Sequence, residues 1–571
     1  MKKRSLWVVG LVIIASTLLG GGFYRLLDVN RKNDAGEVMD VEEIQIADVE
    51  AAGTPRIVER VISSSQLWRP VQERVHDAVL QLFGNVVGNN PCIPYAPPSQ
   101  GAVCGSGFFI NDQGYIITNA HVVQDATSII AQIPSLGKRI IDVEVVGMSP
   151  DRDLALLRVS EESLELIRGE LGSVPYLALG DSDLIRRSDD VLALGYPLGQ
   201  QSLKSTTGVI SGREQNMIQM SAPINPGSSG GPLLNTRGEV IGINTSGIVE
   251  AQNVGYAIPV NDLRIILPDL HKVKILRRPF LGVLFNNATE AMTEYLGNPQ
   301  PGGCYVVEVI KGSPLDKVGV KSGDMLYSIN GYPIDIYGEM KLPFSEDKIS
   351  IIDYVSRLAL GDKINLIVYR SGTKKEFNLT FGLPDQQPIR EVFLAYETID
   401  YEIFAGMVVV PLTLNHIPIL AKQAPGLTKY ADAKNQTEPV LLITHIFPNS
   451  QLYRSRSLPV GATINEVNGM KVKTLEEFRE AIKKSCSSGF LTIRASDNVT
   501  RKSENVLVVL PWKKILQEEP QLARDFRYPT TKLAQAILRA NSINKPLHDQ
   551  MKLPQSPGDL TVVAMDGSSA Q

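Results

Sequence analysis

Between about residues 70 and 270, the hydrophobic positions fall into short runs separated by Gly, Asn, Asp and Pro. Val, Ile and aromatic residues are frequent in these runs, as they are in β-strands. Many short strands at close, regular spacing are typical of an all-β barrel or sandwich. The clearest runs are GFFIN (107–111), GYIIT (114–118), IDVEVVG (141–147), LALLRV (154–159), DVLALGYP (190–197), GVISG (208–212), EVIGIN (239–244) and GYAIP (255–259).

The N-terminus has a different pattern, in which Lys2, Lys3 and Arg4 precede twenty uncharged residues, 5–24. At about 1.5 Å per residue, a helix of that length crosses a hydrocarbon core of about 30 Å. The positive charges stay in the cytoplasm, so the rest of the chain is exported. No A-x-A site follows, so we expect residues 1–27 to remain as a membrane anchor; a cleaved signal peptide is the alternative.

The anchor is followed by an acidic segment, which we predict to be a flexible linker over residues 28–69. Residues 34–50 contain seven acidic residues and no Lys or Arg. Such a composition buries too little apolar surface to offset the entropy of ordering. The linker would tether the first folded domain to the membrane.

The composition excludes several classes of protein. The 571 residues give room for about three to five domains, and 43% hydrophobic with 21% charged residues describes soluble globular domains. The net charge is −4, and no Lys/Arg cluster occurs beyond the first four residues, which argues against nucleic-acid binding. Four cysteines and the absence of CxxC, HExxH and GxxxxGK[ST] strings exclude a disulfide scaffold, a zinc protease and a P-loop ATPase.

Three strings inside the β-rich region carry residues suited to catalysis. The first ends a strand shortly before His121, the second places Asp153 directly before a run that reads as a buried strand, and the third surrounds Ser229 with glycines. Singly, each has an ordinary structural interpretation: a hydrogen-bonded structural histidine, an aspartate that caps a turn, and a Gly/Ser turn. Together they follow the chain order His, Asp, Ser of the chymotrypsin arrangement.

The strings T-N-A-H-V-V, D-L-A-L-L and G-S-S-G-G-P-L, with N-V-G-Y-A-I-P downstream, resemble the HtrA (Deg, Do-like) family of trypsin-fold serine proteases over roughly residues 70–510. The resemblance implies a double β-barrel protease domain over 70–272 and assembly into trimers. Ser229 is then the nucleophile, His121 the general base, and Asp153 the residue that orients the imidazole. The N–H groups of Gly227 and Ser229 form the oxyanion hole. This chemistry requires no metal or organic cofactor.

Alignment on the Ser229 string also predicts the specificity pocket. None of its residues is acidic, so an entering Lys or Arg would lose hydration without gaining a partner. We therefore expect cleavage after small or branched aliphatic residues. Ser228 stands where related zymogens carry Asp, so we expect control by loop rearrangement rather than by proteolytic clipping. The floor is assigned to Pro223, Ile224 and Asn225, and one wall to Thr245, Ser246 and Gly247.

An internal repeat follows the protease region, with an offset of 138 residues between Asn330-Gly331 and Asn468-Gly469. The first copy, residues 278–386, resembles a PDZ domain. Its loop would present backbone N–H groups to a terminal carboxylate while the peptide adds a strand to the sheet. A packing module without a ligand is the alternative. The loop comprises Phe280, Leu281, Gly282 and Val283.

The second copy, residues 390–512, is more divergent, since its candidate loop Phe404-Ala405-Gly406-Met407-Val408 lacks the L-G-V ending. Both peptide binding and a packing or assembly role remain open for it. Residues 513–571 would form a C-terminal extension, with a helix over 532–540 and a mobile tail.

Cys92 and Cys104 bracket a Pro-rich stretch and could close a disulfide loop, worth about 3 kcal/mol in an oxidising compartment. Two unpaired thiols are the alternative. Cys304 and Cys486 fall in separate apolar segments and are expected to be small buried core residues.

These observations predict a mainly β protein: an N-terminal signal or transmembrane segment, a chymotrypsin/trypsin-like double-barrel protease domain, and two PDZ domains of α+β type. The expected function is a periplasmic serine endopeptidase that degrades unfolded or misfolded envelope proteins under PDZ control. A membrane-anchored regulatory protease with one signalling substrate is a rival, and a chaperone or scaffold without essential proteolysis is another. The expected partners are unfolded proteins, C-terminal peptides, the inner membrane and two or more further copies of the chain, but no nucleic acid.

Overall fold

The computed structural model describes residues 64–214, 216–245, 254–278, 281–382, 387–484, 489–500 and 503–543. The chain divides into two units, Met1–Arg74 and Val75–Gln571. Helix α2 (Ser64–Val75) begins in the first unit, so residues 64–69, assigned above to the linker, are helical. The predicted anchor lies outside the described residues, and no helix within the described ranges is long and apolar enough to cross a membrane.

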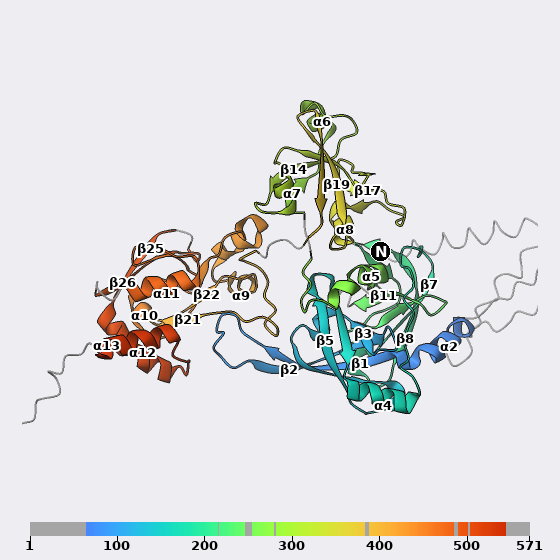
Figure 1. Cartoon of the computed structure of the whole chain (residues 1–571), viewed down its shortest axis with the longest axis horizontal. Coiled ribbons are helices and arrows are strands. Elements are labelled where there is room, and N and C mark those ends of the chain that lie inside the picture. The colour runs from blue at the N-terminus through green and yellow to red at the C-terminus, as the bar shows by residue number, and fades with distance from the viewer. Residues whose placement is uncertain are drawn as a thin grey trace, which may run out of the picture. The chain divides into compact units, whose positions relative to one another are not determined.

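The β-rich region folds into two closed six-stranded barrels (Figure 1), which confirms the predicted double-barrel protease fold. The strand order is β1-β2-β3-β6-β5-β4 in the first barrel and β10-β11-β12-β9-β8-β7 in the second. All the neighbouring strands run antiparallel. The strands are β1 (Val79–Gly88), β2 (Ser99–Phe109), β3 (Tyr115–Thr118), β4 (Ala126–Gln132), β5 (Ile141–Ser149), β6 (Leu154–Val159), β7 (Asp190–Gly195), β8 (Lys204–Glu214), β9 (Met217–Met220), β10 (Pro232–Leu234), β11 (Val240–Thr245) and β12 (Gly255–Pro259).

Helices cover parts of the barrels and explain why some strands are apolar on both faces. Strand β6 is buried at five of its six positions. Helix α5 (Val260–Leu270), which follows the last strand of the second barrel, packs on β11 and also on β5 and β6 of the first. The two short elements that matter most for the site are α3 (Ala120–Val123) and a 3₁₀ turn (Pro150–Arg152); α4 (Glu161–Leu171) packs on the first barrel.

The first repeat is a sheet of order β13-β14-β15-β19-β20, with β13 (Val283–Asn286) at the edge. Its core surrounds Cys304, Val306 and Leu366, all nearly or fully buried. The remaining elements are α6 (Glu290–Tyr295), β14 (Cys304–Val309), α7 (Pro314–Val318), β15 (Met325–Ile329), β16 (Tyr332–Pro333), β17 (Glu339–Met340), β18 (Ile349–Ser350), α8 (Ile351–Ser356), β19 (Lys363–Arg370) and β20 (Thr373–Thr380).

The second repeat has the sheet order β21-β22-β23-β24-β26-β27, which repeats the main sheet of the first with β21 added at the edge; the separate pair β17-β18 of the first repeat has no counterpart among the described residues of the second. The two Asn-Gly turns have nearly equal φ angles, 51° and 81° at 330–331 and 51° and 78° at 468–469. Both fit a type I′ hairpin turn, which requires positive φ at both central residues. The strands are β21 (Glu402–Phe404), β22 (Met407–Pro411), β23 (Leu441–Ile446), β24 (Thr463–Val467), β25 (Met470–Lys471), β26 (Phe490–Ser496) and β27 (Val506–Pro511).

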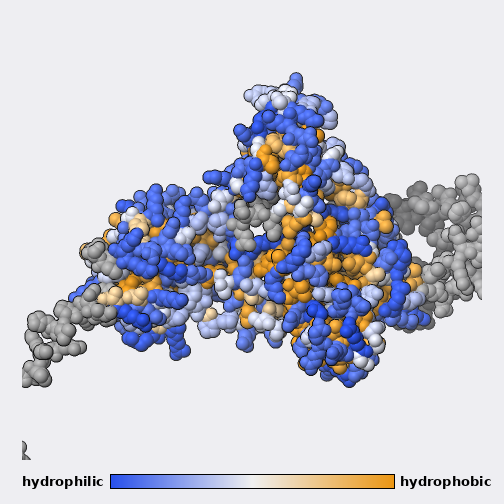
Figure 2. All heavy atoms as spheres, in the orientation of Figure 1, coloured by the Kyte–Doolittle hydropathy of each residue, from blue (hydrophilic) through white to orange (hydrophobic). Residues whose placement is uncertain are grey.

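The helices of the C-terminal segment belong to this second domain. Trp512, Ile515, Leu533 and Ile537 are buried in its core, so α12 and α13 close the domain instead of extending away from it. In Figure 2 the visible surface in this part of the molecule is mainly hydrophilic. The helices are α9 (His416–Leu420), α10 (Gln451–Ser455), α11 (Leu475–Lys483), α12 (Trp512–Asp525) and α13 (Lys532–Ile543).

Candidate active site

His121 and Asp153, two of the residues singled out in the sequence, lie together in the first barrel. β3 ends at Thr118, and the single turn of α3 that follows carries His121. Asp153 ends the 3₁₀ turn in a left-handed conformation, with φ of 53°. His121 Nδ1 is 2.9 Å from each carboxylate oxygen of Asp153, and the backbone N–H of His121 donates to Oδ1 at 3.0 Å. The carboxylate can therefore hold both the position and the tautomer of the ring.

Two further residues fix Asp153, and the sequence pattern did not reveal either role. The Thr245 hydroxyl donates to Asp153 Oδ2 at 3.1 Å, and the Asn119 side-chain amide donates to the Asp153 carbonyl at 3.0 Å. Thr245 was assigned from sequence to the wall of the specificity pocket. Its side chain instead faces Asp153, which leaves only its backbone for the pocket.

The Ser229 turn is attached to the first barrel at the residues just before His121. Gly230 has φ of 86°, and a Cβ there would lie 2.2 Å from both the Ser106 carbonyl and the Thr118 hydroxyl. Only glycine allows this approach. Ser106 N–H also donates to the Ser229 carbonyl at 2.8 Å, and the Thr118 hydroxyl donates to the Ser106 carbonyl at 2.7 Å. Ser106, which sequence reasoning missed, thus joins the nucleophile turn to the strand that leads to the base.

Two N–H groups of the turn, those assigned from sequence to the oxyanion hole, are left without a protein acceptor within the described residues. The Pro226 carbonyl accepts from Leu198 N–H at 2.6 Å, and the Ser228 carbonyl accepts from Gly231 N–H at 3.1 Å. In a trans peptide the N–H points opposite to the carbonyl. The N–H groups of Gly227 and Ser229 therefore point away from these contacts, and within the described residues neither donates to a protein acceptor.

Ser229 and His121 make no direct hydrogen bond within the described residues. In serine hydrolases without substrate, such contacts are often long and tighten when the substrate binds. The hydrogen bonds from Ser229 through Ser106 to Thr118 nevertheless connect the predicted nucleophile to the end of β3, three positions before the predicted base His121.

The described residues of the predicted pocket are consistent with an apolar floor. Ile224 is half-buried and packs against the cluster of the second barrel, whereas Pro223 and Asn225 are exposed. No acidic residue stands among them. Ser246 and Gly247, assigned to the wall, lie outside the described residues.

The predicted disulfide between Cys92 and Cys104 is not formed, because both thiols are free. Cys104 lies within β2 opposite Phe83, where Gln81 Nε2 donates to its sulfur at 3.5 Å. Cys92 lies beyond the paired part of the hairpin, and burial raises the pKa of its thiol to about 11. Cys304 is a buried core residue, as predicted; Cys486 lies outside the described residues. No cluster of metal-binding side chains occurs within the described ranges.

The first PDZ domain has an open groove next to its predicted carboxylate loop. The carbonyls of Leu281 and Gly282 accept hydrogen bonds from the backbone N–H groups of Leu315 and Ile310, so these two carbonyl oxygens point into the domain. A groove runs between this loop, β13 and α8, and Phe280 of the predicted loop lies outside the described residues. The groove is lined by Arg278, Leu281, Val283, Phe285, Ile352 and Val355.

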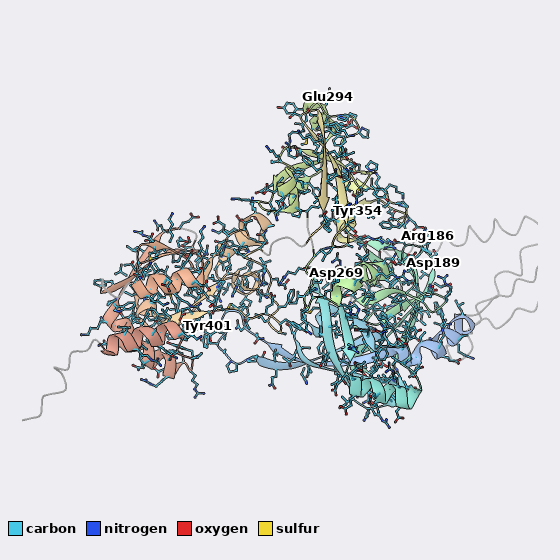
Figure 3. The ribbon with its side chains drawn as sticks, in the orientation of Figure 1. Arg186, Asp189, Asp269, Glu294, Tyr354 and Tyr401 are labelled. Atoms are coloured by element: carbon cyan, nitrogen blue, oxygen red, sulfur yellow. The ribbon has the colours of Figure 1, made fainter. Side chains whose placement is uncertain are left out.

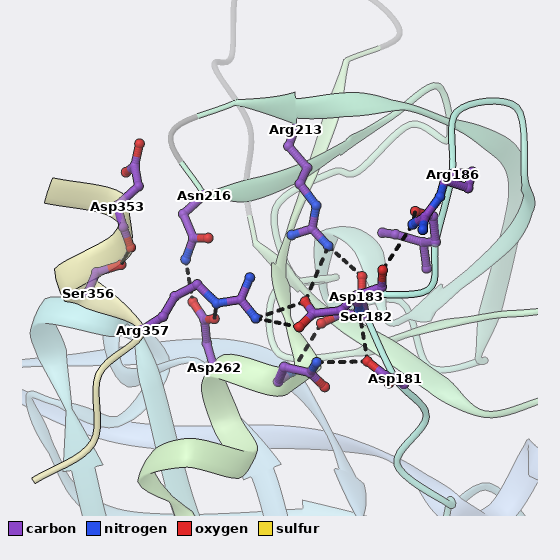
Figure 4. Close-up of polar contacts among 12 residues, drawn as sticks. Asp181, Ser182, Asp183, Arg186, Arg213, Asn216, Asp262, Asp353, Ser356 and Arg357 are labelled. Atoms are coloured by element: carbon purple, nitrogen blue, oxygen red, sulfur yellow. Dashed lines mark hydrogen bonds and ion pairs between the residues drawn. The ribbon is translucent and has the colours of Figure 1, made fainter. Parts of the chain in front are cut away.

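Helix α8, which lines that groove and carries Tyr354 (Figure 3), is also joined to the protease domain. Arg357 donates to both oxygens of Asp183 at 2.8 Å (Figure 4). Its guanidinium also lies 3.8 Å from the Phe344 ring centroid. Its Nε is 3.9 Å from Asp262, whose pKa burial raises to about 6. The pairing matters for stability, because a buried charge without a partner of opposite sign would destabilise the fold.

A second link from α8 ends beside the catalytic aspartate. The Ser356 carbonyl accepts from Arg152 Nη2 at 2.9 Å, and Arg152 directly precedes Asp153. The backbone N–H of Arg278, which lines the groove, donates to Asp151 at 2.7 Å. Two hydrogen bonds therefore connect the groove to the 3₁₀ turn that positions Asp153.

The corresponding edge of the second PDZ domain is already filled. β21 pairs with β22 along the edge that is free in the first domain, and Arg479 on α11 binds Glu402 and Asp400 beside it. The Glu519 carboxylate accepts the Ala405 N–H of the predicted loop at 3.0 Å. Burial raises the pKa of Glu519 to about 7. Within the described residues, this edge of β22 is therefore paired with β21 and is not free for a peptide to add as a strand.

Comparisons with known proteins agree with this architecture. Residues 105–243 match the model of the trypsin-like peptidase domain, and residues 279–381 and 394–532 each match a PDZ domain model. The chain is 30% identical over 358 residues to a probable DegP-like periplasmic serine endoprotease of Ectopseudomonas mendocina, covering 61% of this chain and 70% of that one. It is 31% identical over 417 residues to the Chlamydia pneumoniae protein of the same description, covering 71% and 76%. A solved structure, described as HtrA-type protease AlgW with decapeptide, is 28% identical and covers 56% of this chain and 99% of that one, with a TM-score of 0.43.

Proposed function

Since the chain belongs to the family of DegP-like periplasmic serine endoproteases, it is a serine-type endopeptidase, and we propose that Ser229, His121 and Asp153 carry its reaction. The supporting observation is the hydrogen-bonded pairing of His121 with Asp153, together with a Ser229 turn in which the N–H groups of Gly227 and Ser229 donate to no protein acceptor within the described residues. A nucleophile, a base oriented by a carboxylate and N–H donors for the oxyanion are the groups that acyl transfer by a serine triad uses.

The reaction follows from the placement of these groups. His121 Nε2 takes the proton of the Ser229 hydroxyl as its oxygen attacks the scissile carbonyl. The carbonyl oxygen becomes negative and is held by the N–H groups of Gly227 and Ser229. The C–N bond then breaks while His121 returns the proton to the leaving amine, and water repeats the sequence to release the acid. Asp153 stabilises the imidazolium in both halves.

The protein works in the periplasm, where it degrades unfolded or misfolded envelope proteins. Residues 5–24 anchor it in the inner membrane, and it assembles as a trimer or as a larger assembly of trimers. The first PDZ domain binds exposed C-termini, since its groove combines an apolar lining with Arg278. The rival role, a regulatory protease for one substrate, is favoured by the bonds from α8 to Arg152, which give a terminal peptide a route to Asp153.

One comparison separates the two roles. Full-length protein is incubated with a panel of unrelated proteins, each in a folded form and in a reduced, alkylated, unfolded form. A quality-control protease cuts most of the unfolded forms and few of the folded ones. Cleavage of a single panel member, or of folded and unfolded forms at equal rates, would contradict this role and favour the regulatory one.

Ile224 is expected to limit the depth of the specificity pocket. Ile224→Ala should raise cleavage after Leu and Phe relative to cleavage after Val, because the shorter side chain leaves room for a longer substrate residue. A change of this kind alters such ratios by about 10- to 200-fold at most. A peptide library assayed by mass spectrometry measures the ratio in both proteins. A library cut mainly after Arg or Lys would refute the apolar pocket.

The first PDZ domain is expected to bind a peptide with a free C-terminal apolar residue more tightly than the same peptide amidated. The amide lacks the anion that the loop N–H groups and Arg278 attract. Occupancy can change turnover only through a difference in affinity between the active and inactive states, typically about 1 to 3 kcal/mol. Turnover of a fixed reporter is measured against added peptide in wild type and in Ile352→Glu, which places a carboxylate in the groove. Equal rates under all conditions would show that this domain does not switch the enzyme.

A further inference from the structure

The hairpin of β1 and β2 leaves the first barrel and places its loop, residues 89–98, on the second PDZ domain. Ten residue pairs join the strands, from Val79 with Phe108 to Gly88 with Ser99. Beyond the last pair, Cys92 is only 7% exposed, in an apolar cluster whose other members, apart from Tyr95 of the same loop, lie between residues 389 and 528. The protease domain thus contributes a side chain to the core of another domain.

The rest of the hairpin loop is held there by specific contacts. The Tyr95 ring lies 6.4, 6.0 and 6.1 Å from the rings of Tyr401, Phe447 and Tyr528, with tilted or edge-on geometries that aromatic pairs favour; Figure 3 labels Tyr401. The fully buried His416 lies with Nε2 3.1 Å from the Pro91 carbonyl. Because His416 Nδ1 accepts the N–H of Thr413, Nε2 carries the proton and donates it.

The other end of the same hairpin meets the active-site turn. From Ser99 to Ser106 strand β2 covers about 23 Å at about 3.3 Å per residue, and its pairing with β1 makes it stiff. At Ser106 the hydroxyl donates to the Gly227 carbonyl at 2.7 Å and accepts Tyr196 N–H at 2.9 Å. Its N–H donates to the Ser229 carbonyl. A displacement of β2 therefore moves both sides of the oxyanion hole.

A second contact between the same two domains reaches the helix of the base. The segment entering the second PDZ domain places Phe393 in the core of the first barrel, and the Tyr396 hydroxyl donates to the Val123 carbonyl at 3.2 Å. Val123 lies two residues after His121 in α3. The second domain is therefore bonded directly to the helix of the base, and it reaches the Ser229 turn only through the hairpin.

We propose that the second PDZ domain supports the active site through the β1–β2 hairpin, with Ser106 as the positioning residue at which the hairpin holds the Ser229 turn. The partner of this domain is then the hairpin loop of its own chain. A peptide is not its partner, because β21 already occupies the sheet edge to which a peptide would add. The proposal rests on the assignment of Ser229 and its turn as the catalytic site.

The test uses the full-length chain and a short fluorogenic peptide substrate. Tyr95→Asp puts a charge into the aromatic cluster and should release the loop, and we expect kcat to fall on the order of ten- to a hundredfold with KM unchanged, because small misplacements of catalytic groups cost that much. Tyr95→Phe keeps the ring and should restore wild-type kcat. Gln100→Ala, on the exposed part of β2, is the matched control and should leave kcat unchanged.

Ser106→Ala should lower kcat by a similar factor, and adding Tyr95→Asp to it should lower kcat little further, since the two changes act on one route. Hydrogen exchange over residues 89–98 reports release of the loop, and Tyr95→Ala serves if Tyr95→Asp does not fold. A kcat within twofold of wild type in a variant whose loop exchanges freely would overturn the proposal, as would fully additive losses. Inactive wild type would instead refute the catalytic assignment.

Discussion

Ser229→Ala should lose peptidase activity by a factor on the order of 10⁶ while keeping its fold. The substitution removes one oxygen from a turn whose conformation is held by backbone contacts: the Ser229 carbonyl binds Ser106, and Gly230 binds the Asn244 carbonyl through its N–H. None of these contacts involves the Ser229 hydroxyl, so the turn should keep its conformation. The acyl-enzyme intermediate, in contrast, cannot form without that hydroxyl. Degradation of an unfolded protein and labelling by a fluorophosphonate should both disappear, while the thermal midpoint stays near that of wild type.

Ser228 provides a matched control for this prediction, because it is the neighbouring hydroxyl in the same turn. Ser228→Ala should stay within about threefold of wild type, as a change of about 0.5 kcal/mol would give. His121→Ala should lose about as much activity as Ser229→Ala, and the double variant little more, since the two residues act as a unit. Fluorophosphonate labelling that persists in Ser229→Ala would refute the assignment of the nucleophile.

Asp153→Asn should lower kcat by about 10⁴ with little change in the fold. The carboxylate oxygens of Asp153 accept from His121 Nδ1, from its backbone N–H and from Thr245. An amide has one acceptor oxygen and turns two N–H donors toward the same groups. The imidazole would then present Nδ1 as an acceptor and carry its proton on Nε2, where it cannot take the proton of Ser229.

Thr245→Val serves to distinguish two effects of changing Asp153: the loss of the correct His121 tautomer and the loss of one hydrogen bond that supports the carboxylate. It removes only the hydroxyl that reaches Asp153, so the expected fall in kcat is about fivefold, corresponding to about 1 kcal/mol for one hydrogen bond. Stopped-flow measurement of acylation compares the two variants directly. Asp153→Asn within tenfold of wild type would contradict the role given to this carboxylate.

The sequence by itself determined the order of the domains and the identity of the catalytic candidates. Strands can be recognised from local sequence, because short alternating or continuous apolar runs bounded by Gly, Asn and Pro are typical of β-strands. The two Asn-Gly turns likewise require positive φ wherever they occur, so the repeat could be found without a structure. His121, Asp153 and Ser229 stood out because three ordinary motifs occurred in one informative order.

Only the tertiary structure decided which residues support these groups, because support depends on contacts between segments far apart in the chain. Thr245 and Asp153 are 92 positions apart, and Ser106 and Gly227 are 121 apart. The sequence left peptide binding open for the second PDZ domain, and only the pairing of β21 with β22 shows that the corresponding sheet edge is occupied there. Cys92 shows the same limit: its spacing to Cys104 permitted a disulfide, but the hairpin carries Cys92 into the core of another domain.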